Sequence, residues 1–276
     1  MGLVTFVVLL VCVYITYRGR KDKEFLSRYS LDNHAVLVSK EYRRLLTSGF
    51  VHADWRHLGA NMLTLYLFSY RFEETIGLGL FAGIFFGSLL AGNLFALFIN
   101  RHRSHYQAVG ASGAVSGVMF AAIAFFPSLT LRFVVLPIFF PGWIYGLAYI
   151  LYSIAGIRRG SGNIGHEAHL AGGIFGMATI LAFYPNLLFE NPLPIAAILV
   201  PSLVFLVYTV ARPDSLLIGK FISKPKKYES QDDRYNSEKV EREQELNKLL
   251  DKINDKGIER LSEKEKEQLE ELSETL

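Results

Sequence analysis

Three short groups of polar residues could carry acyl-transfer chemistry, and each adjoins an apolar segment. Ser112 lies in the run Gly110-Ala111-Ser112-Gly113, His169 opens another apolar stretch, and His57 and Asn61 stand four residues apart. Acyl transfer by serine needs a base within hydrogen-bond reach and donors aimed at the oxyanion. Ser112 and His169 are therefore candidates for a Ser–His dyad. His57 and Asn61 would share one face of a helix and could donate to the oxyanion.

The composition indicates a membrane protein that crosses the bilayer several times. The chain has 276 residues, of which 51% are hydrophobic, and its mean hydropathy is +0.25. A helix needs about 20 apolar residues to cross the hydrocarbon core. The predicted fold is an all-α, polytopic membrane helical bundle. Its seven candidate spans are roughly 2–17, 58–76, 78–99, 112–127, 142–157, 167–185 and 193–211.

The order of these spans places the polar groups on one side of the membrane. Spans alternate in direction, so 58–76, 112–127 and 167–185 must run the same way. Each of the three carries its polar residues near its first turn. The unpaired N–H groups and the dipole at the start of the Ser112 helix would also favour an oxyanion.

Two of the connections between spans contain many hydrophobic residues. Residues 18–56 are too hydrophobic for a solvated linker and predict a structured element in the membrane interface. Residues 128–141 predict an interfacial loop, because three prolines argue against one helix. Glycines at four-residue spacing, which lets helices approach closely in lipid, recur at Gly83/Gly87, Gly113/Gly117 and Gly172/Gly176.

The chain divides in composition into residues 1–211, the membrane domain, and a tail at 212–276. The tail begins with lysines and then becomes rich in acidic residues. Its apolar spacing after residue 245 predicts a small helical hairpin. The hairpin is too short to bury a core alone, so it would dock on an unknown protein partner or dimerise. Cys12 is the single cysteine of the sequence, which excludes a disulfide framework.

Other interpretations of the polar residues exist. Ser112 could be a helix-packing residue, and Asn61 an interhelical hydrogen bond. A zinc site from His52, His57 and His169 is conceivable, although the sequence has no HExxH pattern. A transporter or channel would want paired carboxylates in its spans, and the predicted spans offer none.

Taken together, these residues resemble the rhomboid family of intramembrane serine proteases, in a form like its bacterial members. The match extends over roughly residues 36–185. Its motifs, in family order, are His57-x-x-x-Asn61, Gly110-x-Ser112-Gly113, and Ala168-His169-x-x-Gly172 continuing to Gly176. Tyr42-Arg43-Arg44 lies where the family often has Trp-Arg, and Glu73 and Gly77 fit the end of the second span.

The resemblance implies a six-helix core, a function and roles for the residues. Ser112 would be the nucleophile and His169 the general base. His57, Asn61 and the backbone N–H of Ser112 would hold the oxyanion. The substrate would be a transmembrane segment of another protein, and the family needs no metal or cofactor. The alternative within the family is a weak or inactive rhomboid-like protein that binds membrane clients.

The sequence departs from the family pattern in two places. Ser116 stands where the family commonly has an aromatic residue packed on the catalytic imidazole, so another aromatic must fill that space or the histidine is held differently. The seventh span and the tail lie outside the six-helix core. The predicted location is a bacterial inner membrane. Basic residues gather on the Ser112 side, which would face the cytoplasm by the positive-inside rule, whereas bacterial relatives open to the opposite side.

Overall fold

The structure is a computed structural model that describes residues 1–101, 103, 106–132, 139–159 and 165–211, with single residues at 252, 253, 262 and 269. The chain divides into two compact units, Met1–Ile222 and Ser223–Leu276. The first unit holds every element discussed below. The helical hairpin predicted for the tail lies almost wholly outside the described residues.

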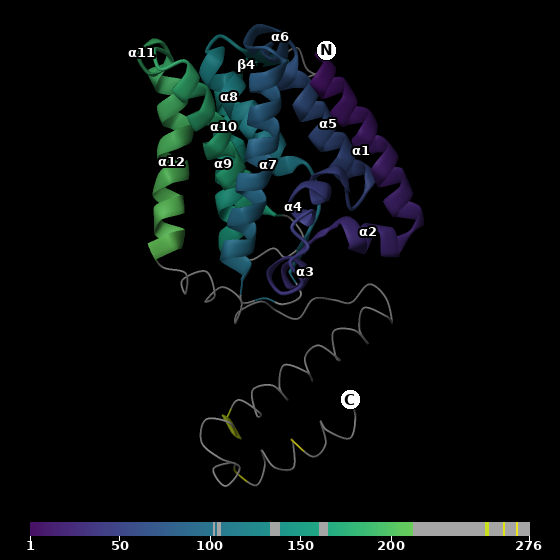
Figure 1. The fold of residues 1–276 in the computed structure, drawn as a ribbon. Coiled ribbons are helices and arrows are strands. Elements are labelled where there is room, and N and C mark those ends of the chain that lie inside the picture. Colours follow the sequence, from purple (N-terminus) through teal and green to yellow (C-terminus); the bar gives the residue numbers. More distant parts are fainter. Residues whose placement is uncertain are drawn as a thin grey trace. The chain divides into compact units, whose positions relative to one another are not determined.

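Among the described residues, seven main helices form the bundle, and each corresponds to one predicted span (Figure 1). They are α1 (Leu3–Lys21), α5 (Trp55–Ser69), α7 (Leu78–Asn100), α8 (Ser112–Phe125), α9 (Gly142–Arg159), α10 (His166–Phe183) and α12 (Pro192–Ala211). Within the described part of the chain, α1, α7 and α12 are long and apolar enough to cross a membrane by themselves. The predicted all-α, polytopic membrane bundle is confirmed, with the seventh span α12 at its edge.

Helix α8 is the centre of the bundle. The helix is short and apolar, and all its residues from Ser112 to Ala124 are buried. Glycines bring α10 against it, since a methyl group on Gly172 would overlap the Gly113 carbonyl oxygen, and one on Gly176 would overlap the Gly117 backbone. Of the predicted glycine contacts, Gly83 alone faces open space among the described residues. The close approach of α8 and α10 is what brings their first turns together.

The second predicted span is not one continuous helix. Helix α5 ends at Ser69, and a short helix α6 (Phe72–Ile76) follows. Between them Arg71 adopts φ 90°, a left-handed conformation that stops the helix. The prediction of a single helix over 58–76 is therefore wrong. The helix also starts earlier than predicted, because the Asp54 carboxylate caps it by accepting a hydrogen bond from His57 N at 2.8 Å.

The two long connections are structured. The first contains α2 (Lys23–Tyr29), β1 (Leu31–Asp32), α3 (Asn33–Leu37), α4 (Arg44–Thr47) and a 3-10 turn, η1 (Ser48–Phe50). Strand β1 pairs antiparallel with β2 (Gln107–Ala108), which leads into α8. The predicted loop at 128–141 contains two paired antiparallel strands, β3 (Thr130–Arg132) and β4 (Phe139–Pro141). A short helix, α11 (Leu187–Glu190), precedes α12.

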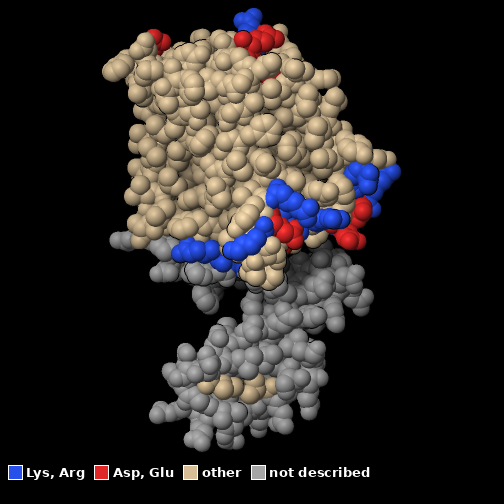
Figure 2. All heavy atoms as spheres, viewed as in Figure 1, with Lys and Arg blue, Asp and Glu red and all other residues tan. Residues whose placement is uncertain are grey.

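Charge is distributed unevenly along the bundle. In the view of Figure 2, Lys and Arg side chains gather at the end where α2 and α3 lie, below a broad uncharged belt. Few charged groups appear at the opposite end of this view. The helices α5, α8 and α10 all begin at the basic end, as the span order predicted (Figure 1).

Candidate active site

Ser112 and His169 form a direct hydrogen bond. Ser112 is the first residue of α8, and His169 lies in the first turn of α10. The Ser112 Oγ atom is 2.7 Å from His169 Nε2. The exposed fractions are 9% for Ser112 and 4% for His169, so the pair is largely screened from bulk solvent. This is the geometry of a hydroxyl nucleophile with an adjacent base.

His57 and Asn61, the second predicted pair, lie beside Gly110 in the loop that precedes α8. Gly110 adopts φ 118°, and a methyl group added to it would lie 2.8 Å from His57 Nε2 and 3.6 Å from Asn61 Nδ2. The Asn61 Nδ2 atom is buried and has no hydrogen-bond partner in the described part of the chain. Buried donors are normally paired, so an unpaired one beside a nucleophile is positioned for an incoming acceptor.

The loop before α8 is held from two directions. Gly110 N donates to the Ser48 carbonyl oxygen at 2.9 Å, and Ala111 N donates to His52 Nε2 at 3.4 Å. The other nitrogen of His52 lies 3.2 Å from the Thr16 hydroxyl of α1. Burial lowers the pKa of His52 to about 3, so its ring is neutral and can accept from Ala111. Helix α1 thus supports the backbone next to Ser112.

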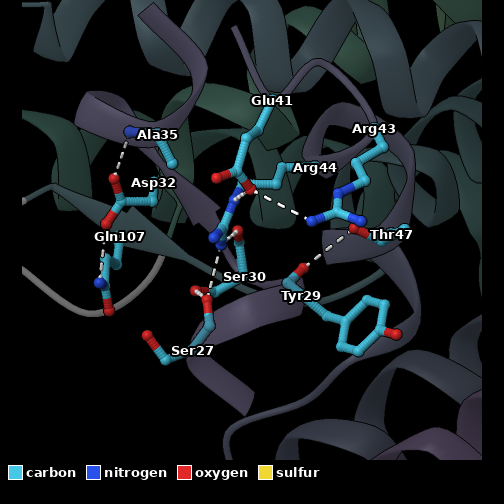
Figure 3. A network of polar contacts seen from close by, with 10 residues as sticks. All are labelled: Ser27, Tyr29, Ser30, Asp32, Ala35, Glu41, Arg43, Arg44, Thr47 and Gln107. Atoms are coloured by element: carbon cyan, nitrogen blue, oxygen red, sulfur yellow. Dashed lines mark hydrogen bonds and ion pairs between the residues drawn. The ribbon is translucent and has the colours of Figure 1, made fainter. Parts of the chain in front are cut away.

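The first connection is itself fixed by the Arg44 guanidinium (Figure 3). Its Nε atom donates to the Glu41 carboxylate at 2.9 Å, and its Nη1 atom donates to the carbonyl oxygens of Ser27 at 2.6 Å and Ser30 at 3.0 Å. Arg44 is 9% exposed, and its hydrogen bond to the Ser30 carbonyl oxygen is buried. These contacts tie α4 to the end of α2 and so hold Ser48, which accepts the Gly110 hydrogen bond.

An aromatic side chain that the sequence motifs did not reveal packs on His169. The Tyr149 ring of α9 stacks on the imidazole with centroids 5.2 Å apart and an interplanar angle of 30°. Its hydroxyl lies 3.1 Å from Ser116 Oγ, and Ser116 in turn donates to the Ser112 carbonyl oxygen at 2.6 Å. Of the two arrangements expected for a chain with serine at 116, the structure has the first, in which another aromatic fills the space.

Two further features concern Glu167 and the predicted zinc site. The carboxylate of Glu167, two residues before His169, accepts a hydrogen bond from Asn100 Nδ2 at 3.5 Å. The zinc hypothesis gains no support, because the described residues contain no group of three or more His, Cys, Asp or Glu side chains able to hold a metal.

The fold and the site together define a polytopic membrane protein with a buried Ser–His pair and, near it, the buried Asn61 Nδ2, which has no partner among the described residues. Residues 39–186 match the model of the Rhomboid domain, which is more than half of the chain. The chain therefore belongs to the rhomboid family. Residues 229–275 match a family of unknown function, DUF6576.

Comparison with curated proteins gives eukaryotic relatives, of which three are described. The chain is 30% identical to Rhomboid protein 1, mitochondrial, of Saccharomyces cerevisiae, over 60% of this chain and 49% of that protein. It is 28% identical to RHOMBOID-like protein 12, mitochondrial, of Arabidopsis thaliana, over 58% and 52%. It is also 28% identical to Presenilin-associated rhomboid-like protein, mitochondrial, of Homo sapiens, over 68% and 49%. The chain spans about half the length of these relatives.

The names of the relatives bear on the predicted location. The three proteins are named as mitochondrial, which argues against the predicted bacterial inner membrane. That the chain is an integral membrane protein agrees with its helices and its family.

Proposed function

We propose that this chain is an intramembrane serine endopeptidase that cleaves transmembrane segments of other membrane proteins. The observation that carries the proposal is the 2.7 Å contact between Ser112 Oγ and His169 Nε2. Membership of the rhomboid family supports the same conclusion. In this proposal Ser112 is the nucleophile, His169 the general base, and no metal or cofactor takes part.

Cleavage would proceed in two acyl-transfer steps. The Ser112 oxygen forms a bond to the scissile carbonyl carbon while its proton passes to His169 Nε2. The carbon–nitrogen bond then breaks, and the imidazolium returns the proton to the leaving amine. Water next attacks the ester on Ser112, with His169 again accepting a proton and returning it to the serine oxygen.

The oxyanion formed in each step would be held between α5 and α8. The buried Asn61 Nδ2 has no partner among the residues that the structure describes, and both it and His57 Nε2 lie beside Gly110. The backbone N–H of Ser112, at the start of α8, has no partner within the helix. Donors set in place before the reaction stabilise developing negative charge without reorganisation. These three groups are therefore the proposed oxyanion hole.

Hydrolysis also needs water at a buried site. A cavity of about 10 Å³ adjoins Ser112, and Ser48 and Asn93 line it together with Gly110. That volume is close to the minimum for one water molecule, and the side chains of Ser48, Asn93 and Ser112 offer it polar partners. The cavity supports a hydrolytic reaction near the basic end of the bundle.

The substrate and the surroundings are part of the proposal. The substrate would be a transmembrane helix that unwinds locally near the membrane surface, where its scissile bond can reach Ser112. The bacterial inner membrane stays a prediction of the location. The mitochondrial names of the relatives argue against it. A protein partner for the tail at 212–276 also stays a prediction.

Loss of the stacked ring should weaken the base. Tyr149→Leu removes the stacking on His169 and should lower kcat about 3- to 10-fold, the size of one aromatic contact. Tyr149→Phe keeps the ring and should stay within about 2-fold of wild type, since a single neutral hydrogen bond contributes little. The measurement is kcat on a model transmembrane substrate in proteoliposomes. Equal activity in Tyr149→Leu and Tyr149→Phe would contradict the role of the stacked ring.

The test of the proposed function is cleavage of a model transmembrane substrate by purified protein in proteoliposomes. Wild type should produce a single cut, while Ser112→Ala and His169→Ala should produce none although both remain folded. Ser202→Ala is a suitable control, because Ser202 is a buried serine on α12, away from the site. Equal cleavage by wild type and Ser112→Ala would overturn the proposal. Binding without cleavage by wild type would favour the inactive, client-binding alternative.

A further inference from the structure

The second ring nitrogen of His169 has a partner that the Ser–His dyad does not use. His169 Nδ1 lies 3.2 Å from the Oγ atom of Ser153, on α9. Ser153 has no exposed surface, so water does not compete for this contact. With Nε2 on Ser112, both nitrogens of the imidazole are engaged by side chains inside the protein.

The direction of these hydrogen bonds follows from a third one. Ser153 Oγ donates to the Tyr149 carbonyl oxygen at 3.0 Å, and a carbonyl can only accept. A serine hydroxyl has one hydrogen, and while that hydrogen is donated to Tyr149 the Ser153 oxygen accepts from His169. The hydrogen of the neutral imidazole must then sit on Nδ1. Nε2 is left without a hydrogen and can accept the hydroxyl proton of Ser112.

We infer that Ser153 is a positioning residue that selects the His169 tautomer able to act as a base. This inference rests on the proposed protease function for its role in catalysis. When Nε2 takes the Ser112 proton, Nδ1 keeps its hydrogen and its bond to Ser153. The proton on Nε2 then leaves with the amine. Ser153 gains and loses no proton, so it orients the ring as the carboxylate of a catalytic triad does, but without a charge.

Helix α9 controls the imidazole through one of its faces. Tyr149 and Ser153 are four residues apart, and such residues lie one above the other on a helix. Tyr149 fixes the plane of the ring by stacking, and Ser153 fixes its rotation by accepting from Nδ1. The His166 ring also packs against the His169 ring in an edge-on contact, with centroids 5.5 Å apart. The base is thus oriented by a helix that contributes neither the nucleophile nor a proposed oxyanion donor.

The test compares Ser153→Ala with Ser153→Thr in the full-length protein. Alanine removes the acceptor, whereas threonine retains a hydroxyl. The matched control is Ser202→Ala, because Ser202 is equally buried and also donates to a carbonyl four residues earlier, at 2.6 Å, on a helix away from the site. It therefore reports the cost of losing a buried serine that lacks a histidine partner.

Two readouts separate positioning from folding. On a model transmembrane substrate, Ser153→Ala should lower kcat about 3- to 10-fold with KM unchanged, as expected for one hydrogen bond that acts on the chemical step. Ser153→Thr should recover most of that loss, and Ser202→Ala should match wild type. The second readout is the ¹⁵N shift of the His169 ring nitrogens in histidine-labelled protein in micelles, assigned by loss of the signals in His169→Gln. Wild type should show Nδ1 protonated, and Ser153→Ala should show a mixture of tautomers.

The outcomes distinguish this inference from the proposed function. Wild-type kcat and unchanged ring-nitrogen shifts in Ser153→Ala would overturn the inference and leave the protease intact. If wild type cleaves nothing, the protease proposal fails, and the ring-nitrogen shifts still show whether Ser153 selects the tautomer. If Ser153→Ala does not fold, Ser153→Cys supplies the test, because a thiol fills the same space but is a weak acceptor. Its shifts should then be mixed, and wild-type shifts would count against the inference.

Discussion

Gly110→Ala should lower cleavage of a model transmembrane substrate by about 100- to 1000-fold, the usual effect of disabling an oxyanion hole. Gly110 adopts φ 118°, which side-chain-bearing residues rarely tolerate. The added methyl group would lie 2.6 Å from His57 Cε1 and 2.8 Å from Nε2, so it would also displace the donor ring. The measurement is kcat in proteoliposomes, with unfolding temperature and helix content recorded alongside.

The control for this experiment is Gly59→Ala. Gly59 lies on α5 between His57 and Asn61, but a methyl group there would meet nothing within 4 Å among the described residues. Its activity should match wild type. Near-normal activity in Gly110→Ala would show that the oxyanion is not held between Gly110 and α5.

Gly176→Ala should destabilise the bundle by about 1–3 kcal/mol, the usual cost of overpacking a well-packed contact. A methyl group on Gly176 would overlap the backbone of Gly117, and backbone atoms in the middle of a helix cannot rotate aside. Helices α8 and α10 would have to separate, which would lengthen the bond between Ser112 and His169. Activity should therefore fall together with stability.

The measurement is the free energy of unfolding in mixed detergent micelles, combined with the cleavage rate. Gly83→Ala is the matched control, because Gly83 belongs to the same four-residue spacing in an apolar helix but faces open space. It should change neither quantity. Equal stability of Gly176→Ala and Gly83→Ala would show that the glycines of α10 are not needed for close packing.

The candidate site was largely predictable from the sequence. Ser112, His169, His57 and Asn61 each lie within the first two turns of a span, and alternating spans put every second helix start on the same side. That argument needs no knowledge of packing, and it correctly brought His169 to Ser112 and both His57 and Asn61 to the loop at Gly110. Their chemical roles stay a proposal until they are tested.

Other features depend on contacts that no local pattern encodes. The break at Arg71 has neither glycine nor proline to mark it. It precedes Glu73, whose buried carboxylate accepts hydrogen bonds from Val4 N at 2.6 Å and Thr5 N at 3.0 Å, at the start of α1. Local sequence spacing cannot predict a hydrogen bond between Glu73 and residues nearly 70 positions earlier in the chain.

The contacts of α9 were unpredictable for a similar reason. The rotation of α9 about its own axis relative to α10 is set by packing between the helices. That rotation decides which residues meet His169. Only the structure could place Tyr149 and Ser153 against the imidazole in place of an aromatic at Ser116.

The most direct test of the Ser–His dyad is labelling by a fluorophosphonate, which reacts with activated serine hydroxyls and needs no knowledge of the substrate. Purified wild type in micelles should be modified at Ser112 alone, as shown by mass spectrometry of its peptides. His169→Ala should lose the label although its Ser112 is intact, because the hydroxyl would lack its base. Equal labelling of Ser112 in wild type and His169→Ala, or labelling at another serine only, would contradict the proposed mechanism.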